Sequence, residues 1–398
     1  MTRGVRVEGV DVARGLASVL MIQGHAFDGW SRPEVKRAGL YALESQGLQS
    51  LALPAFLVLA GAGVALRVEA AVARAEPARD VRRGLLRRGA TLVAAGYALS
   101  AVSALLDGWE GPETWLRADV LHVIGLSLVG LAALGIRGRG AEGVDAGWLT
   151  KVAVALAVVP VLVCPWVSAR THGLTGPVGW VVGPFADVAD ITRMPVVPLV
   201  AWVALGVLVV QAWIATNRDA RDVAGAPPRV VRWTLGLAVA CAGAFTWLEH
   251  GMVAALGGTL SRAHPGVVAN AMQLGARGVF VLGLGAWCAP RIPHRFRTAL
   301  VRLGQGSLWA YAFHVPFCYG APGRWLGLRD ALSGPECVVA ATGLVLASAG
   351  VVWARGWFAQ LGSSRTASGI DAGSKRASGA ARRSSPSPER PARKSTRP

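Results

Sequence analysis

Residues 11–28, DVARGLASVLMIQGHAFD, form the first apolar stretch of the chain and place four ionisable side chains in a segment of membrane-spanning length. Asp11 and Arg14 stand at its start, and His25 and Asp28 stand near its far end. A helix rises about 1.5 Å per residue, so His25 lies roughly 17 Å beyond Arg14, past the middle of an apolar core roughly 30 Å thick. Because ionisable groups are costly at that depth, His25 is a functional candidate.

Asp28 follows His25 by three residues and therefore shares its face of the helix. A carboxylate in that position can orient the imidazole and stabilise its protonated form, as general-base catalysis requires. A polar cluster at the outer membrane interface would contain the same residues. The segment alone leaves both interpretations open.

The composition is that of a polytopic helical membrane protein. Of the 398 residues, 53% are hydrophobic and only 16% are charged, which is more apolar than an ordinary soluble protein. We therefore expect an all-α transmembrane bundle over residues 1–357, followed at 358–398 by a disordered, basic Ser, Arg and Pro-rich cytoplasmic tail. The net charge of +18 is scattered between apolar stretches and concentrated in that tail, so we expect contact with membrane lipid and no nucleic-acid partner. The five cysteines lack metal-type spacing, and no metal is predicted.

Ten apolar stretches are long enough to span a bilayer. Arginine crowds the even-numbered connections and the terminal segments, whereas acidic residues occupy the third connection. The positive-inside rule then places both termini in the cytoplasm. Only four of the 41 basic residues are lysine, a skew typical of GC-rich genomes that indicates a bacterial inner membrane. The predicted helices cover about residues 12–29, 47–66, 89–106, 118–136, 152–168, 194–215, 233–254, 267–289, 300–320 and 336–354.

The ninth stretch carries a second intramembrane histidine, His314, at nearly the same predicted depth as His25 and on a helix that rises in the same direction. The fourth stretch presents Asp119 and His122, again three residues apart. We expect the first, fourth and ninth helices to enclose one polar site. Two alternatives remain at this stage: each histidine bonds a backbone carbonyl independently, and Asp119 is a helix cap.

Further arginines are candidates for binding anions. Arg277 lies inside the eighth stretch, where it needs a carboxylate, carbonyl groups or an anionic ligand. Five arginines beside the cytoplasmic face suit the phosphates of a coenzyme, although the positive-inside rule alone also places arginines there. These are Arg14, Arg82, Arg83, Arg87 and Arg88.

Several short segments occur one after another along the chain in the order of a known family pattern. They are VDVARG at 10–15 running into MIQGH at 21–25, PAFLVLAG at 54–61, VLHVIG at 120–125, MPVVP at 194–198 continuing to Gly206, and YAFH at 311–314. Together they resemble the heparan-α-glucosaminide N-acetyltransferase-like family of multipass membrane acyltransferases, within the wider transmembrane acyltransferase superfamily. The resemblance extends over about residues 7–355.

The resemblance implies transfer of an acyl group, acetyl in the first instance, from cytoplasmic acyl-CoA to a hydroxyl or amine at the other face. It makes His25 the leading catalytic residue, with His314 and His122 lining the site. His122 stands where relatives commonly have Gln, and no histidine occurs between Asp28 and Glu44, where eukaryotic relatives place one. The acceptor therefore stays open among glycans, lipids and small molecules, and the sequence leaves the oligomeric state open too.

Two other classes of protein compete with this interpretation. In a proton-coupled secondary transporter, the histidines would relay protons and Arg277 would bind an anionic substrate. Such transporters often contain inverted repeats and interrupted helices in pairs, which this sequence does not display convincingly. A non-catalytic membrane scaffold would have no need for several intramembrane ionisable groups.

Overall fold

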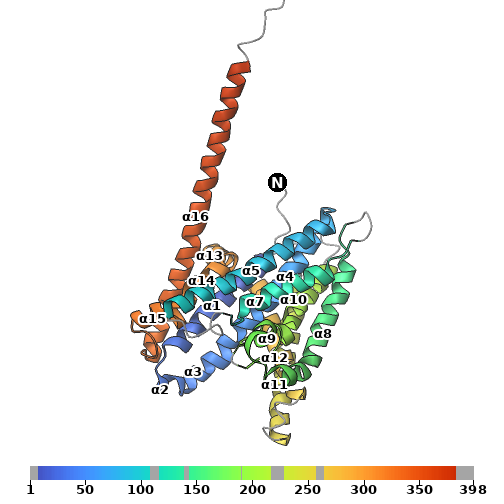
Figure 1. The fold of residues 1–398 in the computed structure, drawn as a ribbon, viewed down its shortest axis with the longest axis vertical. Helices are drawn as coiled ribbons and strands as arrows, with labels where there is room; N and C mark the ends of the chain where they lie inside the picture. The colour runs from blue at the N-terminus through green and yellow to red at the C-terminus, as the bar shows by residue number, and fades with distance from the viewer. Residues whose placement is uncertain are drawn as a thin grey trace, which may run out of the picture.

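The computed structural model describes residues 8–107, 116–138, 143–189, 191–216, 228–256 and 264–381. These residues form helices joined by loops and isolated β-bridges, gathered into one bundle (Figure 1). The main helices are α1 (Glu8–Trp30), α4 (Ala52–Ala73), α5 (Ala78–Asp107), α7 (Val120–Gly135), α8 (Ala146–Thr171), α10 (Val196–Thr216), α11 (Pro228–Leu256), α12 (His264–Cys288), α13 (His294–Gln305), α14 (Ser307–Tyr319) and α16 (Gly334–Ala381).

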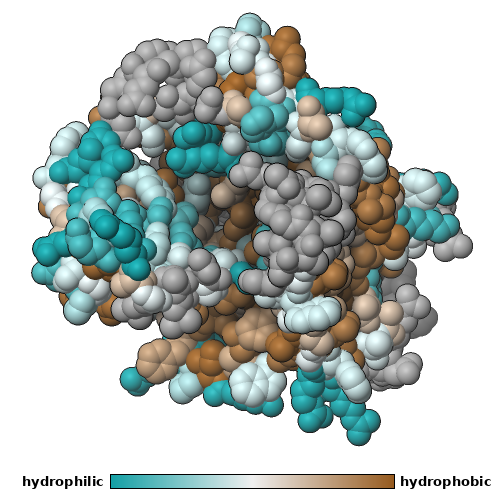
Figure 2. All heavy atoms as spheres, turned by 90° about the horizontal axis from the view of Figure 1, so that it is seen from below, coloured by the Kyte–Doolittle hydropathy of each residue, from teal (hydrophilic) through white to brown (hydrophobic). Residues whose placement is uncertain are grey.

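Shorter elements lie mainly at one end of the bundle, which we call the outer end because α1 finishes there; the opposite end is the inner end. They include α2 (Pro33–Lys36), α3 (Gly39–Ala42), the π-helical turn η1 (Leu43–Leu48), the 3₁₀ turn η2 (Gln49–Leu51), α9 (Gly176–Val182) and α15 (Ala321–Trp325). Figure 2 views the outer end and shows a hollow near its centre, with hydrophobic atoms in its depth.

Seven helices in the described ranges are long and apolar enough to cross a membrane. Some of them expose large apolar side chains: Trp233 on α11 is 79% exposed and Val339 on α16 is 74% exposed. Such surfaces suit contact with lipid, so the chain is an integral, multipass helical membrane protein. The count of ten spans and the cytoplasmic placement of both termini stay predictions.

The expected single helix over residues 300–320 is wrong. Gly306 separates α13 from α14, and the α14 segment has only 13 residues. Glycine is a poor helix former, and a side chain at position 306 would overlap Val352 of α16. This break leaves α13 as an amphipathic helix at the inner end.

Small residues let the central helices pack closely. A Cβ at Gly61 of α4 would overlap the carbonyl oxygen of Val203 on α10, and a Cβ at Gly206 would overlap the carbonyl oxygen of Val58. These reciprocal contacts bring the two backbones together, as small residues do in membrane helices.

The predicted boundary of the tail, at 357/358, falls inside α16. The helix continues to Ala381 and projects from the inner end of the bundle (Figure 1). Residues 382–398 lie outside the described residues, so their disorder stays a prediction.

Candidate active site

Two histidines from distant parts of the chain meet in the outer half of the bundle. His25 Nδ1 on α1 lies 3.0 Å from His314 Nε2 on α14, and the two rings stack with centroids 5.2 Å apart. His314 is fully buried, whereas His25 is only partly buried. The expected shared location of these two histidines is confirmed.

A close contact between the two helices explains why the histidines meet. One turn beyond the pair, a Cβ at Gly29 would overlap the carbonyl oxygen of Cys318. Gly29 and Cys318 lie four residues after His25 and His314 on their respective helices. The Trp30 indole also donates to the Phe317 carbonyl at 3.0 Å. These contacts hold α14 against α1 in the register that pairs the imidazoles.

The hydrogen-bond pattern assigns the tautomers of both rings. His314 Nδ1 lies 2.7 Å from the Ala310 carbonyl oxygen, which can only accept, so this nitrogen carries a hydrogen. In a neutral ring, His314 Nε2 then accepts, and His25 Nδ1 must donate to it. The remaining nitrogen of His25, Nε2, keeps its lone pair and can take a proton.

Asp28 does not have the contact that the sequence predicted. Its two carboxylate oxygens accept hydrogen bonds from the hydroxyls of Tyr41 and Tyr319, each at 2.9 Å. The partner of the His25 ring is His314 instead. Asp28 acts on the site through Tyr319, whose ring centroid lies 5.3 Å from that of His25. The three-residue spacing placed the carboxylate on the expected face, but two tyrosines occupy it.

Asp119 joins α7 to α14 and is also the N-cap of α7. Its Oδ1 accepts from the backbone N–H of Leu121 at 2.9 Å and lies 2.8 Å from His122 Nδ1. Its Oδ2 accepts from the Tyr311 hydroxyl at 3.0 Å. The capping alternative is therefore correct, and the same carboxylate also contacts two side chains of the polar site.

His122 is completely buried beneath α5. Its ring lies edge-on to Tyr97, with centroids 4.1 Å apart, and fills the space left by Gly96, where a Cβ would meet the imidazole. Its Nε2 has no hydrogen-bond partner among the described residues. His122 joins the site through Asp119 and Tyr311, because Tyr311 packs against the His314 ring at 5.7 Å.

Arg277 and Arg14 each have partners within the protein. Arg277 donates to the Ser50 hydroxyl at 2.6 Å, from α12 to η2. Arg14 pairs with Asp11 at 3.1 Å and donates to the Leu59 carbonyl at 3.4 Å, between α1 and α4. The expected grouping of Arg14 with the arginines of α5 is not seen.

A basic hollow of about 520 Å³ opens at the inner end, between the start of α5, the end of α7 and the start of α8. Its basic lining residues are Arg79, Arg82 and Arg137, and the Arg137 guanidinium stacks 4.8 Å from the centre of the Trp148 ring. Of the four predicted α5 arginines, only Arg82 lines this hollow. Arg83, Arg87 and Arg88 are exposed on other parts of the helix surface, so their expected placement with Arg82 is not seen.

Sequence reasoning missed several residues of the site. Tyr311 and Tyr319 flank His314 on α14, and this proximity in sequence was the available signal.

Glu44 is 5% exposed in η1, and neither carboxylate oxygen has a hydrogen-bond partner among the described residues. Its burial and the nearby Asp28 charge raise the pKa of Glu44 to about 7. Arg193 lies in the loop before α10 and acts electrostatically on His25, Tyr311 and Tyr319.

The fold and site thus define a multipass membrane protein with a paired-histidine site near its outer end. The catalytic family model of heparan-alpha-glucosaminide N-acetyltransferase matches residues 6–238. The chain belongs to this acyltransferase family, and the transporter alternative finds no support. No curated protein matches the chain. The matched range contains His25, Asp119, His122 and Arg193, whereas His314 lies beyond it.

Proposed function

We propose that this protein is an integral membrane acyltransferase that moves an acyl group, in the first instance acetyl, from cytoplasmic acyl-CoA to a hydroxyl or amine of a glycan, lipid or small molecule. The single observation that carries the proposal is the hydrogen-bonded pair His25–His314. Its tautomers leave the partly buried His25 with an unprotonated Nε2 beside a polar, tyrosine-rich site. A positioned base with that geometry is what acyl transfer needs.

In the proposed reaction, His25 Nε2 takes the proton from the acceptor oxygen or nitrogen as that atom attacks the thioester carbonyl carbon. The new C–O or C–N bond forms and the C–S bond breaks. The thiolate leaves and receives the same proton from His25, which restores the neutral ring and yields free coenzyme A thiol. His314 accepts a hydrogen bond from His25 Nδ1 throughout and keeps the ring oriented.

The basic hollow at the inner end is the proposed place for the nucleotide end of the donor. Guanidinium groups bind phosphates through charge-assisted, bidentate hydrogen bonds, and Trp148 offers an aromatic surface nearby. One helix, α7, carries both His122 and the hollow-lining Leu134, which are roughly 18 Å apart at 1.5 Å per residue. A donor held by its phosphates at the inner end therefore extends its thioester toward the outer half.

The remaining polar residues have supporting roles in this proposal. Asp119 fixes Tyr311 and His122, and Tyr311 in turn packs against His314. Arg277 on α12 donates to the Ser50 hydroxyl of η2 and stays a prediction as an acceptor-binding residue. The hollow at the outer end is the proposed entry for the acceptor (Figure 2), and a bacterial inner membrane is the proposed location.

The experiment uses the full chain purified in detergent. It should bind acetyl-CoA and release coenzyme A thiol in the presence of a panel of amines, amino sugars and alcohols, with the acetylated acceptor detected by mass spectrometry. The same preparation reconstituted in proteoliposomes should not couple anion uptake to a proton gradient. Failure to bind acetyl-CoA, or proton-coupled uptake without acetyl transfer, would overturn the proposal.

A further inference from the structure

Arg193 lies at the outer end, in the loop between α9 and α10, and its side chain is exposed. The loop is attached directly to the candidate active site. The backbone of Thr192 forms a β-bridge with Ala118, the residue before Asp119. Arg193 is therefore adjacent in sequence to a residue that is bridged to the site.

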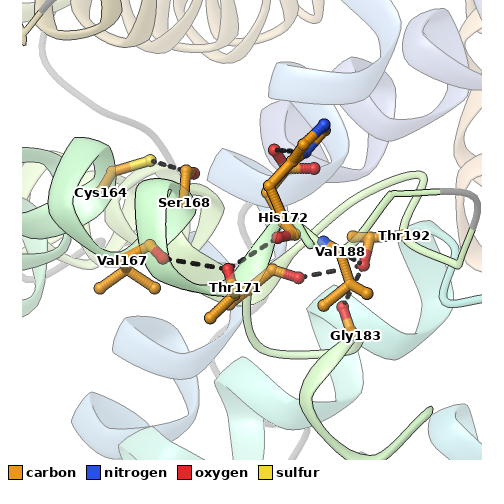
Figure 3. A network of polar contacts seen from close by, with 10 residues as sticks. Cys164, Val167, Ser168, Thr171, His172, Gly183, Val188 and Thr192 are labelled. Carbon is orange, nitrogen blue, oxygen red and sulfur yellow. Dashed lines mark hydrogen bonds and ion pairs between the residues drawn. The ribbon is translucent and has the colours of Figure 1, made fainter. Parts of the chain in front are cut away.

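Hydrogen bonds within the loop hold its shape. The Thr192 hydroxyl lies 2.9 Å from the Gly183 carbonyl oxygen and 3.0 Å from the Ala186 carbonyl oxygen, and it accepts from the Val188 N–H at 3.1 Å. Figure 3 shows Thr192 beside Gly183 and Val188 in this network. One threonine thus fastens three backbone positions immediately before Arg193.

A second set of contacts ties the loop to the end of α8 (Figure 3). The Thr171 hydroxyl lies 2.7 Å from the Asp187 carbonyl oxygen, and His172 Nδ1 lies 3.2 Å from Asp187 Oδ2. On the other side of Arg193, the Val196 N–H donates to the Pro184 carbonyl at 3.0 Å. Arg193 is therefore carried on a backbone that is fixed both before and after it.

The charge of Arg193 reaches the reacting end of the site. It acts electrostatically on His25, Tyr311 and Tyr319, which come from α1 and α14. Among the described residues, its own guanidinium has no hydrogen bond or ion pair. The loop thus presents an exposed cation beside the Ala118–Asp119 segment of the site, at the end of the bundle where the acceptor would enter.

We propose that Arg193 is a specificity-determining residue that binds an anionic oxygen group of the acceptor, such as a phosphate, sulfate or carboxylate. The inference rests on the proposed acyltransferase function and names the chemical class of its acceptor. An arginine fork matches such groups and holds them at a fixed distance and angle. Binding there would leave the acceptor hydroxyl or amine directed at His25.

The test compares paired acceptors that differ only by a phosphate. Full-length protein in detergent is supplied with acetyl-CoA and with an amino sugar or its phosphate monoester, and then with an amino alcohol or its phosphate monoester. We expect wild type to prefer the phosphorylated member by about tenfold or more in kcat/KM. Arg193→Gln should lose that preference, with a much larger fall in kcat/KM for the phosphorylated member than for the uncharged member.

Arg170→Gln is the matched control, because Arg170 is exposed at the same end and bonds the Trp166 carbonyl of its own helix. It removes the same charge and should keep the preference. Inorganic phosphate should compete with the charged acceptor in wild type and in Arg170→Gln but not in Arg193→Gln.

Four results would overturn the inference. Equal use of both acceptors by wild type, or an unchanged preference in Arg193→Gln, would refute it while leaving acyl transfer intact. Inhibition of transfer by soluble short-chain phosphatidylglycerol but not by inorganic phosphate, with no preference between the paired acceptors, would assign Arg193 to lipid headgroups instead. Absence of acetyl transfer to any acceptor would refute the proposed function and this inference with it.

Discussion

Gly29 on α1 packs directly against the carbonyl oxygen of Cys318 on α14, one helical turn beyond the contact between His25 and His314. Both helices rise in the same direction, so the two contacts lie along one seam. The separation of the backbones at Gly29 therefore sets the distance between the imidazoles. A residue without a side chain thus positions the proposed base.

Gly29→Val should push α14 away from α1 and separate the two histidines. Overpacking of this kind typically costs about 1–3 kcal/mol, so the protein should still fold but with a lowered Tm. We expect a larger fall in kcat than in donor affinity, measured by thiol release and acetyl-CoA binding. Gly343→Val on α16, where a Cβ meets open space, is the control and should be near wild type. A fully active Gly29→Val protein would show that the seam does not position the base.

His314→Phe should remove the acceptor that orients His25. The imidazole of His25 would then lose its fixed tautomer, and kcat should fall by about 10²-fold or more with little change in the KM for acetyl-CoA. His294→Phe, at the exposed start of α13, is the control and should leave transfer unchanged. Equal losses of kcat and donor affinity in His314→Phe would indicate a packing defect rather than a positioning role.

Arg82→Gln and Arg137→Gln should weaken binding of the donor. Each removes one guanidinium from the inner hollow, so the KM for acetyl-CoA should rise by about tenfold while kcat stays near wild type. Dephospho-coenzyme A esters should be less sensitive to these variants. Arg83→Gln changes the next residue of the same helix, outside the hollow, and should bind the donor as wild type does. Identical effects from Arg83→Gln would assign the result to general surface charge.

Glu44→Gln should change the pH dependence of stability. The pKa of Glu44 is raised from 4.5 to about 7, so the folded state holds this proton more tightly than the unfolded state. Ionisation of Glu44 therefore lowers the free energy of unfolding progressively as pH rises from 4.5 to 7. Above pH 7 this destabilisation stays at its maximum. Removing the carboxyl should therefore stabilise the protein at pH 8, by up to about 3 kcal/mol, and have little effect near pH 4.5.

Glu76→Gln provides the opposite comparison, since the hydrogen bond from Arg67 lowers the pKa of Glu76. Glu76 contributes stability above its ordinary pKa and loses that contribution as pH falls. Thermal unfolding of both variants between pH 3 and 8 checks the two signs, because the Glu76 contribution is lost only below about pH 4.5. A Glu44→Gln protein that is less stable than wild type at pH 8 would contradict the assignment.

The helical membrane fold was predictable because a helix that crosses the bilayer needs an apolar stretch of nearly fixed length. The meeting of His25 and His314 was also predictable, since depth along a helix follows from residue counting. The break at Gly306 was not predicted, and the Val352 side chain that packs closely beside it comes from a distant helix. Length and hydropathy carry no information about that contact.

The partners of Asp28 show where reasoning from one segment fails. Helical spacing placed its carboxylate on the face of His25, but Tyr41 and Tyr319 come from two other segments and occupy both oxygens. Arg193 was missed for a related reason. Its position depends on a β-bridge between Thr192 and Ala118, and such a contact between loops leaves no periodic signal in the sequence.

The most direct test of the central claim is acetyl transfer by His25→Gln, with acetyl-CoA affinity measured on the same sample. Loss of a positioned general base typically costs about 10²–10⁴-fold in rate. We predict a fall of that size in kcat, an unchanged Kd for acetyl-CoA and an unchanged Tm. Transfer by His25→Gln at the wild-type rate would contradict the account.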